Sequence, residues 1–245
     1  MSGHSKWNNI KRKKEKTDGQ KAKIFTKIGR EIAVAVKEGG SADPASNSKL
    51  KDAIAKAKAN NVPNDNIDRI IKRAAGDGNS DNYEALQYEG YGPCGIAVIV
   101  ETLTDNRNRT AADVRHYFDK YGGNLGQTGC VSFMFNQKGI LAVEAEGLQE
   151  DTVMEDALEA GASDFAADAD IFEITTEPDD FSAVRDDLEA KGYTFVSAEL
   201  QMIPDVYSSI TDEEAIVKME KLLDALEDND DVQNVWHNWE RPDEE

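Results

Sequence analysis

The sequence predicts an α+β protein of several domains, in which an N-terminal helical domain is followed by two α+β domains, one inserted in the other. Three observations predict this architecture. The chain has 245 residues, more than a single domain usually contains. Apolar residues follow a helical period up to about residue 75, and strands and helices alternate after it. The last helix and strand complete a sandwich that begins before residue 136, so the segment between them is read as an insertion.

The first 80 residues predict a basic arm and three helices. Apolar residues recur at helical spacing over residues 20–38 and again over 46–60. Pro63 is suited to begin a third helix, which extends to about Ala74. Three short amphipathic helices can bury their apolar faces against one another, so we expect a helical domain over residues 1–80.

The chain after a turn-rich linker at residues 76–82 has mixed periodicity. The expected elements are strands at 95–103, 131–135, 140–145, 171–175, 194–200 and 232–236, and helices at 106–121, 151–160, 179–191 and 212–228. We expect one α+β domain of residues 81–136 plus 205–245, interrupted by another of residues 137–204. Both have the ferredoxin-like, split β-α-β pattern.

Charge divides the chain more sharply than its net value of -20 suggests. Residues 1–75 contain 18 Lys and Arg against 8 Asp and Glu, whereas residues 76–245 contain 10 against 40. This division predicts that the basic part meets a polyanion, while the acidic part repels it or binds something else.

Several classes of protein are disfavoured by composition. The chain has no apolar run of the length that spans a bilayer, and its N-terminus lacks the features of a secretory signal. Cys94 and Cys130 belong to no CxxC or Cys/His cluster, so we expect neither a disulfide framework nor a metal site. These features predict a cytoplasmic protein with no membrane partner.

No motif points to catalysis. The three histidines are isolated, and HExxH, GxSxG and GxxxxGK[ST] are absent. Asp164, Asp168 and Asp170 can hold a metal in principle, but chance groupings are expected among so many acidic residues. The YGGNLG stretch at Tyr121 follows a helix, which favours a cap and turn over a nucleotide-binding loop. We expect no enzyme, no metal, no cofactor and no small-molecule substrate.

The basic arm predicts nucleic-acid binding. Lys and Arg neutralise phosphates and release counterions, and an indole can stack on an unpaired base. The predicted contacts are His4, Lys6, Trp7, Lys11, Arg12, Lys13, Lys14, Lys21, Lys23, Lys27 and Arg30. The alternative is a solvated tail whose Trp7 packs against the helical domain.

A second candidate surface is TDNRNRTAADVRH, at residues 104–116, where a strand end meets a helix start. Arg107 and Arg109 have the planar fork that suits phosphate, and a helix N-terminus favours an anion. Both can equally pair with local carboxylates, with Asp105 or Asn106 as the N-cap. The residue pattern leaves both readings open.

Five stretches resemble a known family: GHSKWNNIKRKK at Gly3, AKIFTKIGREI at Ala22, YEGYGP at Tyr88, LTDNRNRTAADVRH at Leu103 and GGNLGQTGCVSFMF at Gly122. The chain resembles the YebC/PmpR family, which also contains the mitochondrial translational activator of cytochrome c oxidase. The resemblance implies three domains, one inserted in another, and a cytoplasmic regulator of gene expression. Many members are described as DNA-binding transcriptional regulators. One departure is Cys94, where the family most often has Gly.

We therefore expect a nucleic-acid-binding regulator, with DNA-binding control of transcription as the first hypothesis. The alternative, also implied by the resemblance, is a factor that associates with ribosomal RNA and relieves stalling at proline-rich sequences. The arm would contact phosphates, and Arg107 with Arg109 would form a second surface. No recognition-helix motif is evident, so readout of backbone and shape is expected. Nothing in the sequence requires a dimer, so we expect a monomer or weak oligomer.

Overall fold

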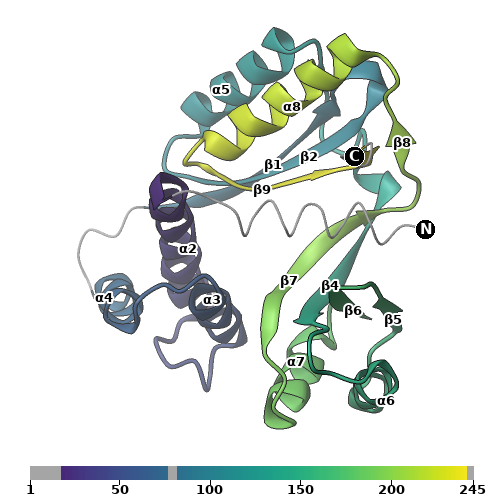
Figure 1. Ribbon diagram of the computed structural model, residues 1–245. Helices are drawn as coiled ribbons and strands as arrows, with labels where there is room; N and C mark the ends of the chain where they lie inside the picture. Colours follow the sequence, from purple (N-terminus) through teal and green to yellow (C-terminus); the bar gives the residue numbers. More distant parts are fainter. Residues whose placement is uncertain (1–17, 77–81, 242–245) are drawn as a thin grey trace. The chain divides into compact units, whose positions relative to one another are not determined.

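The computed structural model describes residues 18–76 and 82–241, with side chains described from residue 21. The chain divides into two compact units. The first comprises Met1–Gly76 and Gln137–Gln201, and the second comprises Asp77–Asn136 and Met202–Glu245. The predicted fold class is confirmed, because helices come first and helices with antiparallel sheets follow (Figure 1). Most of the predicted linker at residues 76–82 lies outside the described residues.

The N-terminal helices are α2 (Asp18–Gly39), α3 (Ser48–Ala59) and α4 (Asn64–Ala75). Their apolar faces form one core, in which Ile32 and Leu50 are fully buried. Asn47 caps α3, because its side chain accepts a hydrogen bond from the backbone N–H of Leu50 at 3.1 Å. The same side chain donates to the Ala35 carbonyl at 2.8 Å and so ties α3 to α2.

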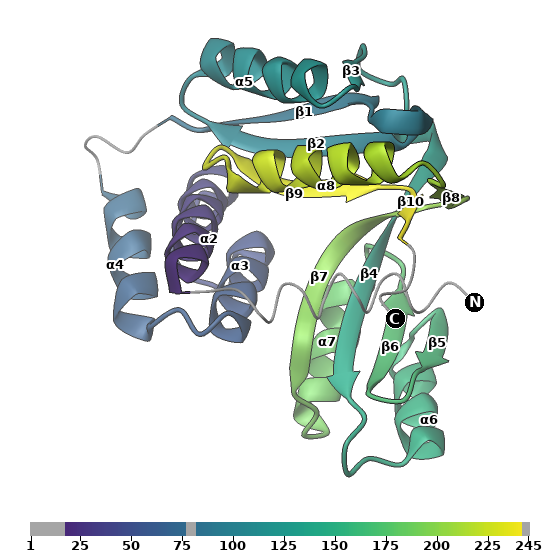
Figure 2. The same ribbon diagram turned by 45° about the horizontal axis from the view of Figure 1, so that its top comes forward.

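The second unit is built on an antiparallel sheet ordered β3-β1-β2-β9. Its strands are β1 (Glu84–Tyr91), β2 (Ala97–Thr104), β3 (Asn124–Leu125) and β9 (Val232–His237). Helices α5 (Arg107–Lys120) and α8 (Glu213–Asp228) lie side by side on one face of the sheet (Figures 1 and 2). A short pair, β8 (Ser208–Ser209) with β10 (Trp239–Glu240), completes the unit. The sheet thus joins segments from both sides of the insertion.

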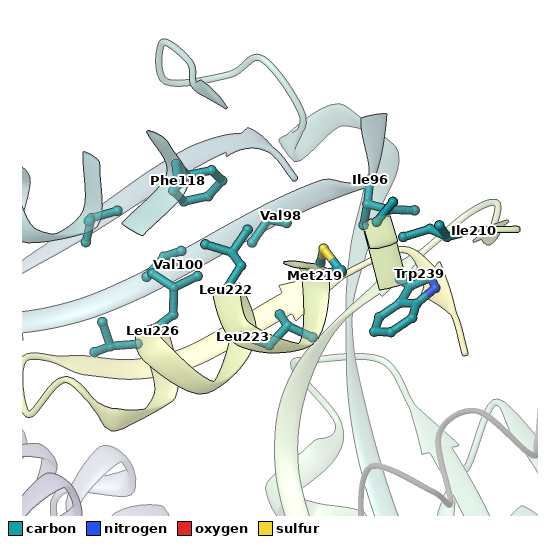
Figure 3. Packing of buried hydrophobic residues seen from close by; sticks show 13 residues of the cluster. Ile96, Val98, Val100, Phe118, Ile210, Met219, Leu222, Leu223, Leu226 and Trp239 are labelled. Atoms are coloured by element: carbon teal, nitrogen blue, oxygen red, sulfur yellow. The ribbon is translucent and has the colours of Figure 1, made fainter. Parts of the chain in front are cut away.

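The core of this unit lies between the sheet and its two helices (Figure 3). Val98 and Val100 of β2 meet Phe118 of α5 and Leu222 and Leu226 of α8, and all five side chains are completely buried. Removing each such side chain from water contributes about 1.5–3 kcal/mol to folding. The core therefore depends on residues separated by more than 100 positions in the chain.

The inserted domain has its own antiparallel sheet and core. Its strands are β4 (Phe135–Glu144), β5 (Asp164–Ala167), β6 (Ile171–Thr176) and β7 (Phe195–Pro204), ordered β5-β6-β4-β7, and its helices are α6 (Glu150–Ala160) and α7 (Phe181–Ala190). Leu141 and Ile174 from the sheet pack against Val153 of α6 and Leu188 of α7. Both helices thus cover one face of the sheet.

A buried arginine joins α7 to α3 within the first unit. Arg185 is 2% exposed, and its Nη1 lies 2.8 Å from the Asp52 carboxylate. Ser182 donates to the same carboxylate at 3.0 Å, and Asp186 accepts from Arg185 at 3.1 Å. Lys51 forms a further ion pair with Asp186. The helical domain and the inserted domain therefore meet through a charged contact.

The described helices match the predicted helices to within two residues at each end. The predicted strand at residues 131–135 is wrong: Ser132–Met134 form a 3-10 turn, and β4 begins only at Phe135. The reason is a competing acceptor, because the N–H groups of Val131 and Ser132 bind the Glu89 carboxylate rather than a neighbouring strand. Strand β1, which contains Glu89, was not predicted at all.

Cys94 occupies a backbone conformation that suits glycine. It lies in the turn between β1 and β2 with φ 56° and ψ 21°, in the left-handed region. A side chain there costs about 1–2 kcal/mol because Cβ approaches the following carbonyl oxygen. This explains why Gly is common at this position of the motif that the sequence resembles.

We expect Cys94→Gly to raise the free energy of unfolding by about 0.5–1 kcal/mol, since relief of the left-handed strain exceeds the added entropy of the unfolded chain. Urea titration measures this. The control is Cys94→Ala, which removes the exposed thiol and keeps Cβ. Equal midpoints for the Gly and Ala variants would contradict the assignment of strain.

Candidate nucleic-acid interface

The predicted contacts of the arm lie outside the described residues, and they stay predictions. These are His4, Lys6, Trp7, Lys11, Arg12, Lys13 and Lys14. The structure places the other four predicted contacts of this region on α2: Lys21, Lys23, Lys27 and Arg30.

Three of the α2 residues share one face of the helix. Lys23, Lys27 and Arg30 are spaced by four and three residues, which brings their side chains to one side. Ile28 and Ile32 lie on the other side, in the core. Lys37, which the sequence analysis did not select, extends the same face by two further turns and is exposed. Helix α2 therefore presents a basic stripe opposite its apolar stripe.

Helix α4 carries a second basic stripe that the sequence analysis missed. Arg69, Lys72 and Arg73 are exposed and spaced at i, i+3 and i+4, so they lie on one side of the helix. The amphipathic pattern of IDRIIKRAA contained this signal. The apolar residues of the pattern indicated the helix, and its basic residues were not weighed as contacts.

Two lysines of α3 form ion pairs with glutamates of α2. Lys49 pairs with Glu38 and Lys56 with Glu31, each at 2.7 Å. The Lys56 pair is mostly buried, with both side chains less than one quarter exposed. Two of the four lysines of α3 thus pair within the helical domain, and Lys51 pairs with Asp186 of the inserted domain.

The second candidate surface begins where α5 leaves β2 (Figure 1). Asn106 is the N-cap, and its side chain accepts from the backbone N–H of Arg109 at 3.1 Å. Arg107 is 68% exposed, and its Nη1 lies 3.5 Å from the carboxylate of Glu84, which is also exposed. An exposed pair of this kind contributes little, so the Arg107 guanidinium can exchange it for a phosphate.

Arg109 is held inside a polar network. Its Nη2 lies 2.7 Å from Asp231 and 2.8 Å from Asp105, and its Nε donates to Asp231 at 3.3 Å. Asp231 is buried and also accepts from the Thr110 hydroxyl at 2.8 Å. Hydrogen bonds to Asp231 and Asp105 raise the pKa of Arg109 above its ordinary value. Arg107 and Arg109 therefore differ: Arg107 is presented outward, whereas Arg109 anchors the α5 start to Asp231.

A buried carboxylate organises the loop that follows β3. Glu89 is 1% exposed, and it accepts hydrogen bonds from the backbone N–H groups of Gly129, Val131 and Ser132 at 2.8–2.9 Å. Burial raises the pKa of Glu89. The hydrogen bonds from these three N–H groups and from the Gln87 side chain lower the pKa by more than burial raises it, so the net pKa lies below the ordinary value of 4.5. The loop is consequently held by an anion.

This loop presents an aromatic side chain to solvent. Phe133 is 75% exposed, whereas Val131 and Phe135 on either side of it are buried against Ala97 and Ile99. The Tyr91 hydroxyl donates to the Cys130 carbonyl at 3.1 Å and braces the loop from β1. An exposed ring on a braced loop can stack on a base or on another protein. The sequence signal was GGNLGQTGCVSFMF, whose apolar end was read as a strand.

Among residues 18–76 and 82–241, no group of three or more His, Cys, Asp or Glu side chains is suited to hold a metal ion. In the same part of the chain, no helix combines the length and apolar composition that crossing a bilayer requires.

Comparison with known families matches the chain in two segments. Residues 5–77 match the N-terminal domain of the TACO1/YebC protein, and residues 83–239 match the TACO1/YebC second and third domains. Together the two matches cover nearly the whole chain.

Individual relatives agree with these matches. A probable transcriptional regulatory protein of Acetivibrio thermocellus is 62% identical over 240 residues, which are 98% of this chain and 99% of the relative. One of the same name from Ruminiclostridium cellulolyticum is 62% identical over 245 residues, covering 100% of this chain and 98% of the relative. The crystal structure of a conserved hypothetical protein from Aquifex aeolicus is 44% identical and superposes with a TM-score of 0.84, covering 94% of each chain.

We expect Arg109→Ala to lower the free energy of unfolding by about 2 kcal/mol, because it leaves the buried Asp231 carboxylate without its cation. Arg107→Ala is the matched control and should change stability by less than about 0.5 kcal/mol, since both side chains of its ion pair with Glu84 are exposed. Guanidinium titration of both variants measures the difference. Equal losses would show that the network does not depend on Arg109.

We expect Glu89→Gln to lower the free energy of unfolding by about 2–3 kcal/mol near neutral pH, because the amide accepts weaker hydrogen bonds than the carboxylate. Folding lowers the pKa of Glu89 from its ordinary value of 4.5. The ionised carboxylate therefore contributes its full stabilisation above pH 4.5. That stabilisation is lost as pH falls through the lower folded-state value. Urea titrations from pH 7 to pH 3 should therefore show the gap between wild type and variant closing in acid.

Glu84→Gln, at the exposed start of the same strand, is the control for the loss of one carboxylate. It should leave stability within about 0.5 kcal/mol of wild type over the same pH range. A gap for Glu89→Gln that stays constant from pH 7 to pH 3 would rule out the carboxylate as the holding group.

Proposed function

Because the chain belongs to the TACO1/YebC family, and its relatives are named probable transcriptional regulatory proteins, we propose that it is a DNA-binding regulator of transcription. Its activity is binding, with no catalytic step and no cofactor. Such a regulator acts in the cytoplasm, and the proposed partner is duplex DNA.

One observation supports this proposal above the others: basic residues are concentrated in the N-terminal part of the sequence, and on its described helices α2 and α4 they form stripes. Residues 1–76 contain 18 Lys and Arg against 8 Asp and Glu, whereas the inserted segment 137–201 contains 3 against 18. Within the described residues, α2 and α4 each gather three or more basic side chains on one side. Ordered positive charge of this kind suits the regular spacing of phosphates.

The proposed mode of binding is contact with the DNA backbone. The arm and the α2 stripe neutralise phosphates, with Trp7 stacking or lying against a sugar. Arg107 adds a second contact from the α5 start, and Arg109 holds that start in place through Asp231. Lys and Arg contacts to phosphate fix register and carry little sequence information, so specificity comes from the shape of the duplex. The acidic segments limit coating of DNA by excess protein.

We expect DNA binding to weaken steeply with salt, and the triple variant Lys23→Gln, Lys27→Gln, Arg30→Gln to make the dependence shallower. Each phosphate contact contributes about -0.9 to the slope of log K against log salt, so loss of three contacts changes the slope by about 2.7. Fluorescence anisotropy with a labelled duplex from 50 to 300 mM KCl measures both slopes. The electrostatic screening length falls roughly two- to threefold over this range.

The matched control is Lys138→Gln, Lys191→Gln, Lys218→Gln. It removes the same charge from lysines that lie outside the helical domain and pair with Glu177, Asp156 and Glu214. The control should keep the wild-type slope. Equal changes in both triple variants would mean that net charge alone governs binding. Tighter binding to an RNA hairpin than to any duplex DNA would overturn the transcriptional assignment in favour of an RNA target.

A further inference from the structure

The loop of residues 126–134, which we call the Phe133 loop, turns one aromatic ring outward. Phe133 is 75% exposed, the largest exposed fraction among the large apolar side chains that the structure describes. Val131 and Phe135, two residues to either side, are buried against the sheet. A Phe side chain stabilises a fold only when it is removed from water, so the core of this unit does not account for the ring at residue 133.

The backbone on both sides of this ring is fixed. The residue before it, Ser132, donates its N–H to the buried Glu89 carboxylate at 2.8 Å. The residue after it, Met134, accepts at its carbonyl a hydrogen bond from the N–H of Asp205 at 2.9 Å. A side chain on a fixed backbone loses little conformational entropy when a ligand binds to it. Phe133 is therefore presented as a preformed flat surface.

The segment that carries this ring is uncharged. Residues 121–137 contain no Asp, Glu, Lys, Arg or His, whereas residues 76–245 as a whole contain 40 Asp and Glu against 10 Lys and Arg. The carboxylate that the loop encloses, Glu89, is 1% exposed. A phosphate strand that approaches the loop thus meets no exposed carboxylate of this segment, although most of this part of the chain would repel it.

Polar side chains with free hydrogen-bonding groups accompany the ring. Gln127 and Thr128 are exposed, in a turn that the Cys130 N–H closes on the Gln127 carbonyl at 3.1 Å. Asn124 of β3 is exposed as well. Within the described part of the chain, these three side chains make no hydrogen bond. An amide side chain offers a donor and an acceptor together, which is what the edge of a nucleobase requires.

The surroundings of the ring favour a nucleobase over a protein partner. An aromatic anchor of a protein interface normally lies at the centre of a well-packed patch. In the described part of the second unit, the other exposed large apolar side chains are Tyr91, Val206 and Val217, which lie on β1, before β8 and on α8. Along its own loop, Phe133 is accompanied by amide and hydroxyl groups instead. A nucleobase has a flat face for the ring and polar edges for these groups.

We infer that the Phe133 loop binds an unpaired nucleobase, which stacks on the ring of Phe133 while the loop's polar side chains are available to its edge. Stacking of this kind requires an open base face, which a base inside a duplex does not offer. The ligand is therefore a single-stranded or extruded base of DNA or RNA. The inference rests on the proposed function in assuming that nucleic acid reaches the chain, and it adds a base contact to the phosphate contacts proposed above.

The test compares a labelled duplex with the same duplex carrying a short single-stranded thymidine overhang, by fluorescence anisotropy on the full chain. Wild type should bind the overhang duplex about tenfold more tightly, which is the typical effect of one stacked base. Phe133→Ala and Phe133→Leu should both lose this gain, because Leu keeps apolar surface but has no aromatic face. Phe133→Tyr should keep it.

The control is Val206→Ala, which shortens another exposed apolar side chain of the same unit. It should keep the wild-type gain. Stacking involves no ions, so the gain should persist from 50 to 300 mM KCl while affinity for both probes falls. A gain that disappears at 300 mM would come from the added phosphates and would overturn the inference.

The remaining outcomes separate this inference from the proposed function. Duplex binding with no overhang gain, or with an equal gain in Phe133→Ala, would keep the proposed function and overturn the base site. A Phe133-dependent gain on a free thymidine strand, with no binding of duplex, would keep the base site and reject the proposed function. A uridine overhang identifies the source: a gain with either sugar supports the site, and the larger gain shows whether DNA or RNA supplies the base.

A protein partner is tested by sedimentation. A wild-type dimer that Phe133→Ala dissociates, with the overhang gain unchanged, would assign the ring to a second copy of the chain and overturn the inference.

Discussion

A single buried carboxylate, Glu89, fixes the part of the second unit from which the insertion departs. Its three backbone donors hold residues 129–132 in a turn, which lets Val131 and Phe135 cover Ala97 and Ile99. Strand β4 starts directly after that turn. Among the described residues, the other buried charges, Asp231 and Arg185, are likewise matched by partners. A buried ion that loses its partner costs several kcal/mol, so these three sites constrain the fold more than the ion pairs at its surface.

Periodicity predicted the helices well because each helix buries one apolar stripe against a core. The spacing of the apolar residues within a single segment is enough to indicate that stripe. It failed where the decisive partner is distant. Strand β1 is mostly polar at its start and pairs fully with β2, so its own pattern gave little signal. The apolar run VSFMF looks like a strand, but Glu89, some 40 residues earlier, takes the N–H groups that a strand would need.

The same limit applies to the candidate interface. Composition identified the basic segments, but it did not show which cations are neutralised within the molecule. Arg107 and Arg109 are two residues apart, and nothing in the local sequence distinguishes them. In the structure, Arg109 binds the buried Asp231, 122 residues later, whereas Arg107 pairs with an exposed glutamate. The pattern IDRIIKRAA contains the basic stripe of α4, but only the structure shows that its three basic side chains are all exposed. Which charges neutralise one another depends on the folded chain. The sequence pattern shows only charges that are close together along the chain.

The position of the insertion has a consequence for biosynthesis. The core around Val98 and Val100 needs Leu222, Leu226 and strand β9, which the ribosome makes last. The α2–α4 core and the inserted core are each complete much earlier in the chain. Domains fold as units during synthesis, so the helical domain and the inserted domain fold while β1 and β2 are still without α8 and β9. Because β4 and β7 are neighbours in one sheet, the folded inserted domain brings the segments before and after it close together. The insertion thereby shortens the loop that the last strand must close.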